Sequence, residues 1–125
     1  MNINAYWRCC LHQKADELKT YFHENAYINW HNTNEHFTVD EFIQANCEYP
    51  GKWDGEIQRT EYLKDTVITV VHVFSLDKTI SCHVTSFIKF QNDKIISIDE
   101  YWGDDGLPPT WRKKKKIGRP IRLIR

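Results

Sequence analysis

The sequence contains no apolar run that approaches the roughly 18 residues of a membrane-spanning helix. Its N-terminus, MNINAYWRCCLHQ, has no basic segment followed by an apolar stretch, so we expect no signal peptide and no membrane association. The chain has only four cysteines, and none of them forms a CxxC pair. Together these absences predict a cytoplasmic protein with reduced thiols.

Motifs that mark several enzyme classes are also absent. There is no glycine-rich phosphate loop, no GxSxG sequence and no Walker pattern. Cys82 is followed by His83, but adjacent residues of a strand point to opposite faces, which excludes a Cys-His dyad within it. His23, His31 and His36 match no spacing of metal ligands. We therefore expect neither a metal nor another cofactor.

The formal net charge of zero conceals an uneven distribution of charge. All 17 acidic residues precede Trp111, so residues 1–111, with 9 basic residues, carry −8, and the 8 basic residues beyond give +8. We divide the chain into a single domain, residues 1–112, and a basic tail, residues 113–125. Such a tail can bind nucleic acid, anionic lipid or its own acidic body, and we expect the last. Nucleic acid is disfavoured because no aromatic residues are interleaved with the basic ones.

The remaining sequence shows two kinds of periodicity. Apolar residues recur at helical spacing over residues 5–24, and Thr38 with Glu41 forms a capping box that predicts a second helix over VDEFIQANCEY. The aromatic segment 26–32 between them is extended. Strands with short polar links follow at 56–63, 66–76, 78–91 and 94–103. Helices followed by an antiparallel meander predict an α+β fold in which the N-terminal helices pack against one face of a mostly antiparallel sheet.

The two neighbouring acids Asp99 and Glu100 must point to opposite faces of the last strand. The phase that contains Ile98, Glu100 and Trp102 is the more apolar, so we expect Glu100 on the helix side, in a pocket, and Asp99 on the other face. Both phases of TVITVVHVF are apolar, which predicts that this other face is covered by a second copy of the chain, in a homodimer.

The same choice of phase places three further residues on the pocket side of the sheet, namely His72, Val84 and Ser86. A carboxylate walled by apolar side chains loses hydration, which raises its pKa and suits it to proton transfer near neutral pH. We therefore predict Glu100 and His72 as catalytic residues. Two alternatives remain: Glu100 lies at a wetter cavity mouth, or it is neutralised by His72 or an arginine in a structural pair.

Over residues 5–112, which is nearly the whole chain, the sequence resembles the nuclear transport factor two-like superfamily, in its SnoaL-like branch. The resemblance rests on the order helix, AYINWHN, the helix TVDEFIQANCEYPG, and a meander that ends in DKIISIDEYWGDDG. It implies a cystatin-like cone, in which a strongly curved sheet wraps around helices, with a pocket between them and usually a homodimer. Glu100 matches the position of a pocket-facing acid in several such enzymes. Gly103 stands where many relatives have aspartate, and no arginine is near Glu100 in the meander.

The resemblance, the strand phases and the local sequence together suggest which residues touch a ligand. Tyr27 and Trp30 match positions at the pocket mouth, with the core as the alternative location. Phe42 points from the second helix toward the sheet. Trp53 either closes the pocket or packs as a hydrophobic plug beneath its own loop. Together with Val84, Ser86 and Trp102, these residues form the predicted binding set for a small apolar or aromatic ligand.

Three functions remain open from the sequence. The first is a small-molecule pocket protein of the SnoaL-like type, as a cofactor-independent cyclase, isomerase or dehydratase that uses a pocket carboxylate for proton transfer. The second is a non-catalytic ligand-binding or dimerisation module of the same fold. The third is a binder of acidic partners that acts through the basic tail.

Overall fold

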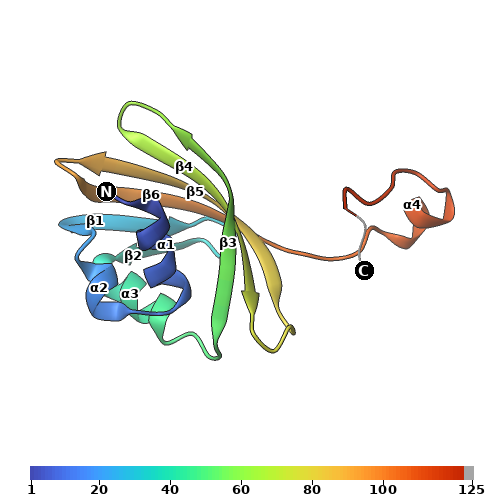
Figure 1. Cartoon of the computed structure of the whole chain (residues 1–125), viewed down its shortest axis with the longest axis horizontal. Coiled ribbons are helices and arrows are strands. Elements are labelled where there is room, and N and C mark those ends of the chain that lie inside the picture. Colours follow the sequence, from blue (N-terminus) through green and yellow to red (C-terminus); the bar gives the residue numbers. More distant parts are fainter. Residues whose placement is uncertain (123–125) are drawn as a thin grey trace.

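The computed structural model describes residues 1–122 and shows helices packed into the hollow of a curved sheet (Figure 1). The helices are α1 (Ile3–Leu11), α2 (Ala15–Lys19), α3 (Val39–Cys47) and α4 (Thr110–Lys114). The strands are β1 (Phe22–Trp30), β2 (Glu35–Thr38), β3 (Trp53–Tyr62), β4 (Thr66–Ser75), β5 (Ser81–Gln91) and β6 (Lys94–Asp104). They form one sheet in the order β2-β1-β6-β5-β4-β3, in which only the β1–β6 pair is parallel among the described residues. The predicted α+β class, the curved sheet and the antiparallel meander are confirmed.

The prediction of one helix over residues 5–24 is wrong, because the chain turns after α1 and residues 22–24 already belong to β1. Gln13 adopts a left-handed conformation with φ of 55° in this turn. Its side-chain amide donates to the backbone oxygens of Asn46, at 3.1 Å, and Tyr49, at 2.8 Å. These bonds hold the turn against the loop that follows α3.

The second predicted helix is α3, and its capping box is confirmed. The backbone N–H of Thr38 donates to the Glu41 carboxylate at 2.9 Å, and the backbone N–H of Glu41 donates to the Thr38 hydroxyl at 3.3 Å. This reciprocal pairing satisfies two donors that the first turn of a helix otherwise leaves free. The short strand β2, which ends at the same threonine, was not predicted.

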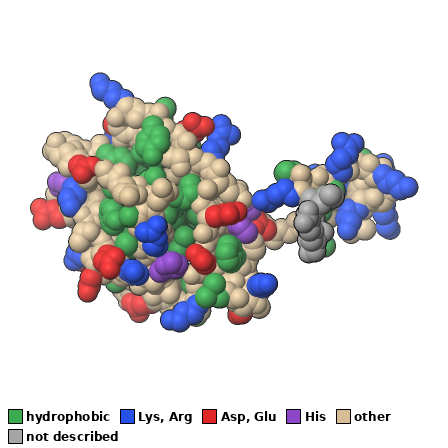
Figure 2. Space-filling view, in the orientation of Figure 1, with side chains coloured by type: hydrophobic (Ala, Val, Ile, Leu, Met, Phe, Trp, Pro, Cys, Tyr) green, Lys and Arg blue, Asp and Glu red, His purple; other side chains and the backbone are tan. Residues whose placement is uncertain are grey.

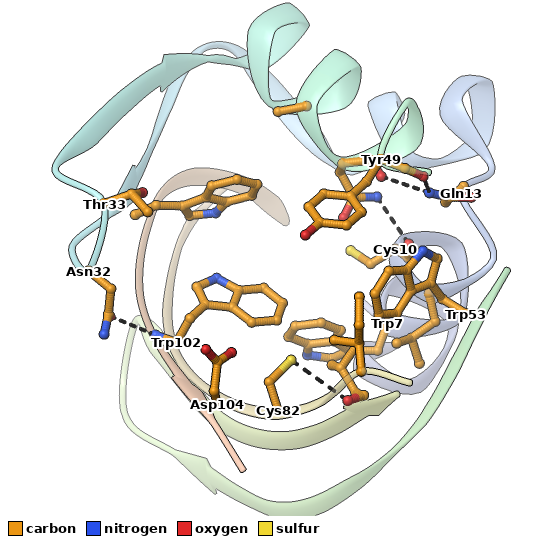
Figure 3. Close-up of a pocket in the computed structure, with 16 residues that line it drawn as sticks. Trp7, Cys10, Gln13, Asn32, Thr33, Tyr49, Trp53, Cys82, Trp102 and Asp104 are labelled. Atoms are coloured by element: carbon orange, nitrogen blue, oxygen red, sulfur yellow. Dashed lines mark hydrogen bonds between the residues drawn. The ribbon is translucent and has the colours of Figure 1, made fainter. Parts of the chain in front are cut away.

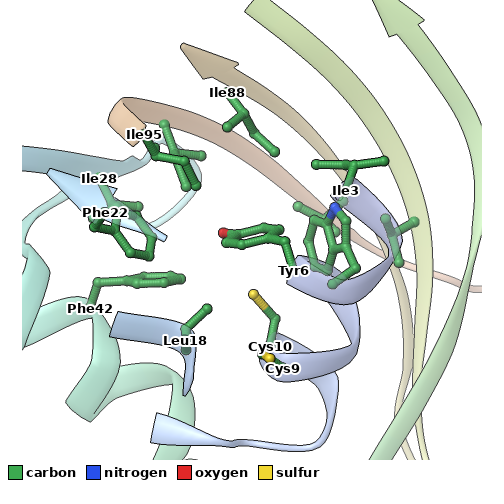
Figure 4. Packing of buried hydrophobic residues seen from close by; sticks show 14 of the residues in the cluster. Ile3, Tyr6, Cys9, Cys10, Leu18, Phe22, Ile28, Phe42, Ile88 and Ile95 are labelled. Carbon is green, nitrogen blue, oxygen red and sulfur yellow. The ribbon is translucent and has the colours of Figure 1, made fainter. Parts of the chain in front are cut away.

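The core lies between the helices and the concave face of the sheet (Figure 4). Tyr6 of α1 is fully buried and makes edge contacts with the rings of Trp7, Tyr21 and Phe22. Phe42 of α3 packs against the Phe22 ring, with ring centroids 5.7 Å apart. Edge-to-face contacts of this kind stabilise a core beyond the area that they bury.

The alternation of side chains along each strand decides which of them reach this interior. For residues 66–76, the prediction that the phase containing His72 faces inward is wrong. The buried residues of β4 are Val67, Thr69, Val71, Val73 and Ser75. His72 therefore points to the convex face. Both phases of this strand carry β-branched residues, so alternation alone does not distinguish them.

The prediction for the next two strands is confirmed at their centres. Val84 and Ser86 of β5 and Glu100 of β6 are buried on the concave face, whereas Asp99 is on the other side. At the start of β6 the register shifts, and Ile95 rather than Ile96 is buried.

After β6 the chain leaves the domain. Every described residue from Gly103 to Arg122 is exposed, and α4 lies apart from the sheet (Figure 1). Figure 2 shows basic side chains clustered on this segment. The expectation that the tail folds back onto its own acidic body is therefore wrong for residues 113–122, and residues 123–125 lie outside the described part. Within residues 1–122, no helix has the length and apolar character needed to cross a membrane.

Candidate functional site

A cavity of about 280 Å³ opens between the sheet, the end of α1 and the loop that joins α3 to β3 (Figure 3). Five aromatic side chains line it: Trp7, Trp30, Tyr49, Trp53 and Trp102. The other lining residues are Cys10, Leu11, Gln13, Asn32, Thr33, Ala45, Asn46, Val73, Ile80, Cys82 and Asp104. The wall is thus mainly apolar, with few polar groups, which is typical of small-molecule sites.

Hydrogen bonds hold three of the four indole rings in place. The Nε1–H of Trp7 donates to the Thr69 hydroxyl at 3.0 Å, and that of Trp53 donates to the Pro50 carbonyl at 3.1 Å. The Nε1–H of Trp30 donates to the carboxylate of Glu100 at 2.9 Å. The buried Nε1–H of Trp102 has no hydrogen-bond partner among the described residues.

Most polar side chains around the cavity are already bound to the protein. Gln13 donates to backbone oxygens in the last turn of α3 and in the loop that follows it, and the side chain of Asn46 donates to the Cys10 carbonyl at 3.0 Å. Asn32 accepts a hydrogen bond from the backbone N–H of Trp102 at 2.8 Å. These bonds, drawn in Figure 3, connect the rim to the helices and to β6.

Glu100 is buried directly behind the aromatic wall, with 2% of its surface exposed. One carboxylate oxygen accepts from Trp30, and the other accepts from the Ser86 hydroxyl at 2.5 Å. Burial raises the pKa of Glu100, and the hydrogen bonds from Ser86 and Trp30 offset part of this rise. No described Lys or Arg forms an ion pair with it. The carboxylate does not itself line the cavity.

His72 lies on the convex face, across the sheet from Glu100. Its Nε2 is 2.9 Å from the Ser81 hydroxyl, and its ring stacks on that of His83 with centroids 4.8 Å apart. Asp105 is 2.5 Å from Nδ1 of His83. Burial tends to raise the pKa of Asp105, but hydrogen bonds from Ser81 and His83 outweigh it and the pKa is lowered. The premise that His72 assists Glu100 from the same face is therefore wrong.

The predicted binding residues separate into those at the cavity and those elsewhere. Trp30, Trp53 and Trp102 line the cavity. Tyr27 is three residues from Trp30 in β1, so the two side chains point to opposite faces of the strand. The Tyr27 side chain is 42% exposed and its ring rests against that of His36. Three predicted residues are buried behind the wall: Phe42, Val84 and Ser86.

Sequence reasoning missed 13 of the 16 lining residues, among them Trp7, Cys10, Tyr49, Cys82 and Asp104. Cys82 and Asp104 carried a usable signal, because they share the strand phases of Val84 and Trp102 respectively. Burial raises the pKa of the Cys82 thiol to about 11 and also raises that of Cys10, so both present neutral thiols to the cavity. They act as apolar wall residues rather than nucleophiles.

No protein-family model and no curated protein matches this sequence. Among solved structures, an NTF2-like protein of unknown function from Burkholderia xenovorans superposes with a TM-score of 0.77 at 19% identity, over 96% of this chain and 92% of that one. A candidate ketosteroid isomerase from Kribbella flavida gives 0.77 at 17% identity, over 94% and 85% of the two chains. The chain has the nuclear transport factor two-like fold.

Solved structures also include one named for the branch that the sequence resembles. A candidate SnoaL-like polyketide cyclase from Shewanella putrefaciens superposes with a TM-score of 0.65 at 11% identity, over 78% of this chain and 75% of that one. A cystatin-fold protein is also similar, in agreement with the expected cone. At these identities the likeness shows the fold, while the reaction and ligand are separate questions.

Proposed function

We propose that this chain binds a small, flat and mostly apolar molecule in the aromatic cavity. The observation that carries the proposal is the enclosure of about 280 Å³ by four indole rings and one phenol ring. Burial of a ligand against such rings provides hydrophobic stabilisation, and the fixed indoles add little ordering cost.

A catalytic role for Glu100 is the second candidate, and the rise in its pKa through burial favours it. Cyclases, isomerases and dehydratases that need no cofactor move a proton next to a carbonyl group, which a carboxyl group of raised pKa can do. The carboxylate lies behind Trp30 and both of its oxygens are engaged. A substrate proton reaches it only if the Trp30 ring moves, so the binding function has the stronger support.

Titration with 1-indanone, a flat aromatic ketone, tests both candidates in one sample. We expect saturable quenching of tryptophan fluorescence in the wild type, because the ketone enters the ring-lined cavity. Trp102→Leu is expected to weaken this binding about tenfold, since it removes one wall of the cavity. In D₂O, NMR of the bound ketone reports exchange of its α-protons, which is expected to be equal in the wild type and in Glu100→Gln.

Trp111→Leu is the matched control for this titration. Trp111 is 59% exposed on the segment beyond the sheet, so its loss removes one fluorophore without altering the cavity. Equal affinity in the wild type, Trp102→Leu and Trp111→Leu, or no saturable binding, contradicts the binding proposal. Faster α-proton exchange in the wild type than in Glu100→Gln supports the catalytic candidate instead.

We also propose that the convex sheet face pairs with a second copy of the chain. Phe87 and Tyr101 on this face are 40% and 46% exposed, beside the half-buried Ile68, Val70 and Phe74. Sedimentation equilibrium is expected to give twice the chain mass, and Phe87→Glu is expected to give the monomer, because a charge would be buried in the contact. Leu107→Glu, at an exposed position beyond the sheet, is the control. A monomeric wild type at micromolar concentration contradicts the pairing.

A further inference from the structure

The rings of the cavity are arranged at steep angles to one another around a common centre. The rings of Trp30 and Trp102 meet at 69° with centroids 6.2 Å apart, and those of Tyr49 and Trp53 meet at 81° with centroids 5.3 Å apart. Trp7 forms a further side (Figure 3). An aromatic ring attracts a cation through the negative potential of its face, most strongly for tryptophan.

The charge at the cavity is negative, and so is the net charge of the surrounding domain. Of the 16 described residues that line it, none is Lys or Arg, and Asp104 contributes a carboxylate at the rim. The domain around the cavity carries an excess of acidic residues, since residues 1–111 contain 17 acids against 9 bases. An anionic ligand would meet repulsion here without a compensating partner, whereas a cationic ligand would be attracted.

The polar groups of the wall narrow the choice further. Gln13, Asn32 and Asn46 already bond within the protein, and the unpartnered Nε1–H of Trp102 is only a donor, so these groups offer few acceptors to a ligand. A primary ammonium group needs three acceptors, and its burial without them is costly. A methylated ammonium group carries the same charge with no such requirement, and its methyl groups fit an apolar aromatic wall.

We infer that the ligand of this cavity is a small organic cation with a methylated ammonium group, held by the rings of Trp7, Trp30, Trp53 and Trp102 and neutralised by Asp104. This inference rests on the proposed binding function and names its ligand class. The ammonium group would lie among these rings, on the side of the rim where the Asp104 carboxylate is located.

The test compares choline with 3,3-dimethyl-1-butanol, which has the same shape but replaces the charged nitrogen by carbon. Isothermal titration calorimetry is expected to show at least about tenfold tighter binding of choline, since the cation–π attraction and the attraction to Asp104 act on choline alone. Asp104→Asn is expected to weaken choline severalfold while leaving the butanol unchanged. Asp105→Asn removes the same charge one residue away, from a carboxylate bound to Ser81 and His83, and is expected to have a smaller effect.

The outcomes separate this inference from the proposed function. If the butanol binds as tightly as choline or more tightly, or if neither binds while 1-indanone does, the cavity accepts small molecules but the cation assignment is overturned. If choline, the butanol and 1-indanone all fail to bind to a folded wild type, both are overturned. Tighter binding of choline that is equally reduced in the two aspartate variants overturns the role of Asp104.

Discussion

Replacement of Gly55 by alanine is expected to lower the free energy of unfolding by about 3 kcal/mol. A Cβ atom at this position would lie 2.3 Å from the backbone oxygen of His72 and 3.1 Å from Cδ2 of Leu11. The first of these is a backbone atom of the neighbouring strand β4 and cannot rotate away. The clash would push β3 off both β4 and α1, and with it Trp53, two residues earlier in β3. Urea denaturation followed by circular dichroism measures the loss.

Gly103→Ala is the matched control for this substitution. It makes the same change on β6, where an added Cβ would meet no atom within 4 Å. Its stability is expected to be unchanged or slightly increased, because alanine restricts the unfolded chain more than glycine does. Similar stability of the Gly55→Ala variant and the wild type would show that β3 and β4 separate easily, and the close approach would not matter for the fold.

Glu100→Ala is expected to destabilise the protein by a similar amount, about 3 kcal/mol. The substitution leaves the Trp30 N–H and the Ser86 hydroxyl without their partner and creates a void behind the aromatic wall. Glu100→Gln preserves both contacts, because its amide oxygen accepts from Trp30 and its amide nitrogen donates to Ser86. The alanine variant should therefore unfold at a much lower urea concentration than the glutamine variant. Equal midpoints would show that these hydrogen bonds contribute little.

The wild type, with glutamate at position 100, and Glu100→Gln should also differ in how their stability depends on pH. Burial raises the pKa of Glu100, so the folded protein keeps the proton at pH values where the unfolded chain has lost it. Stability from this group is therefore present below the unfolded pKa and lost as pH rises through the folded pKa. Glutamine does not titrate, so urea midpoints should shift in favour of Glu100→Gln from pH 4 to pH 8. A shift in favour of the wild type would mean that the cavity wall stabilises the charged carboxylate.

The parts of the fold that follow from local chemistry could be predicted from the sequence. The capping box at Thr38, the antiparallel meander and the inward direction of Glu100 each depend on neighbouring residues or on simple alternation. The inward phase of β4 could not be predicted, because both of its faces are apolar. The break at Gln13 depends on bonds to the α3–β3 loop, and a sequence gives no sign of a left-handed glutamine.

The cavity was predicted only in part, because it too depends on contacts between distant parts of the chain. Trp30, Trp53 and Trp102 stood out because aromatic residues at those positions are unusual or match a known pattern. Trp7 has the spacing of an ordinary helical core residue, and Tyr49 follows a helix end, so neither suggests a ligand. The cavity depends on where α1 and the α3–β3 loop rest on the sheet, and these are contacts between distant parts of the chain.

The bonded indoles of Trp7, Trp30 and Trp53 have a consequence for selectivity. A ligand that is one ring larger than the cavity accommodates would have to displace one of these indoles from its hydrogen bond. Each such bond contributes about 1 kcal/mol. A smaller ligand would leave part of the wall without contact, because the rings of Trp7, Trp30 and Trp53 cannot close over it without breaking their hydrogen bonds. The cavity should therefore discriminate between chemically related ligands by size, and its affinity should change stepwise with each added methyl group.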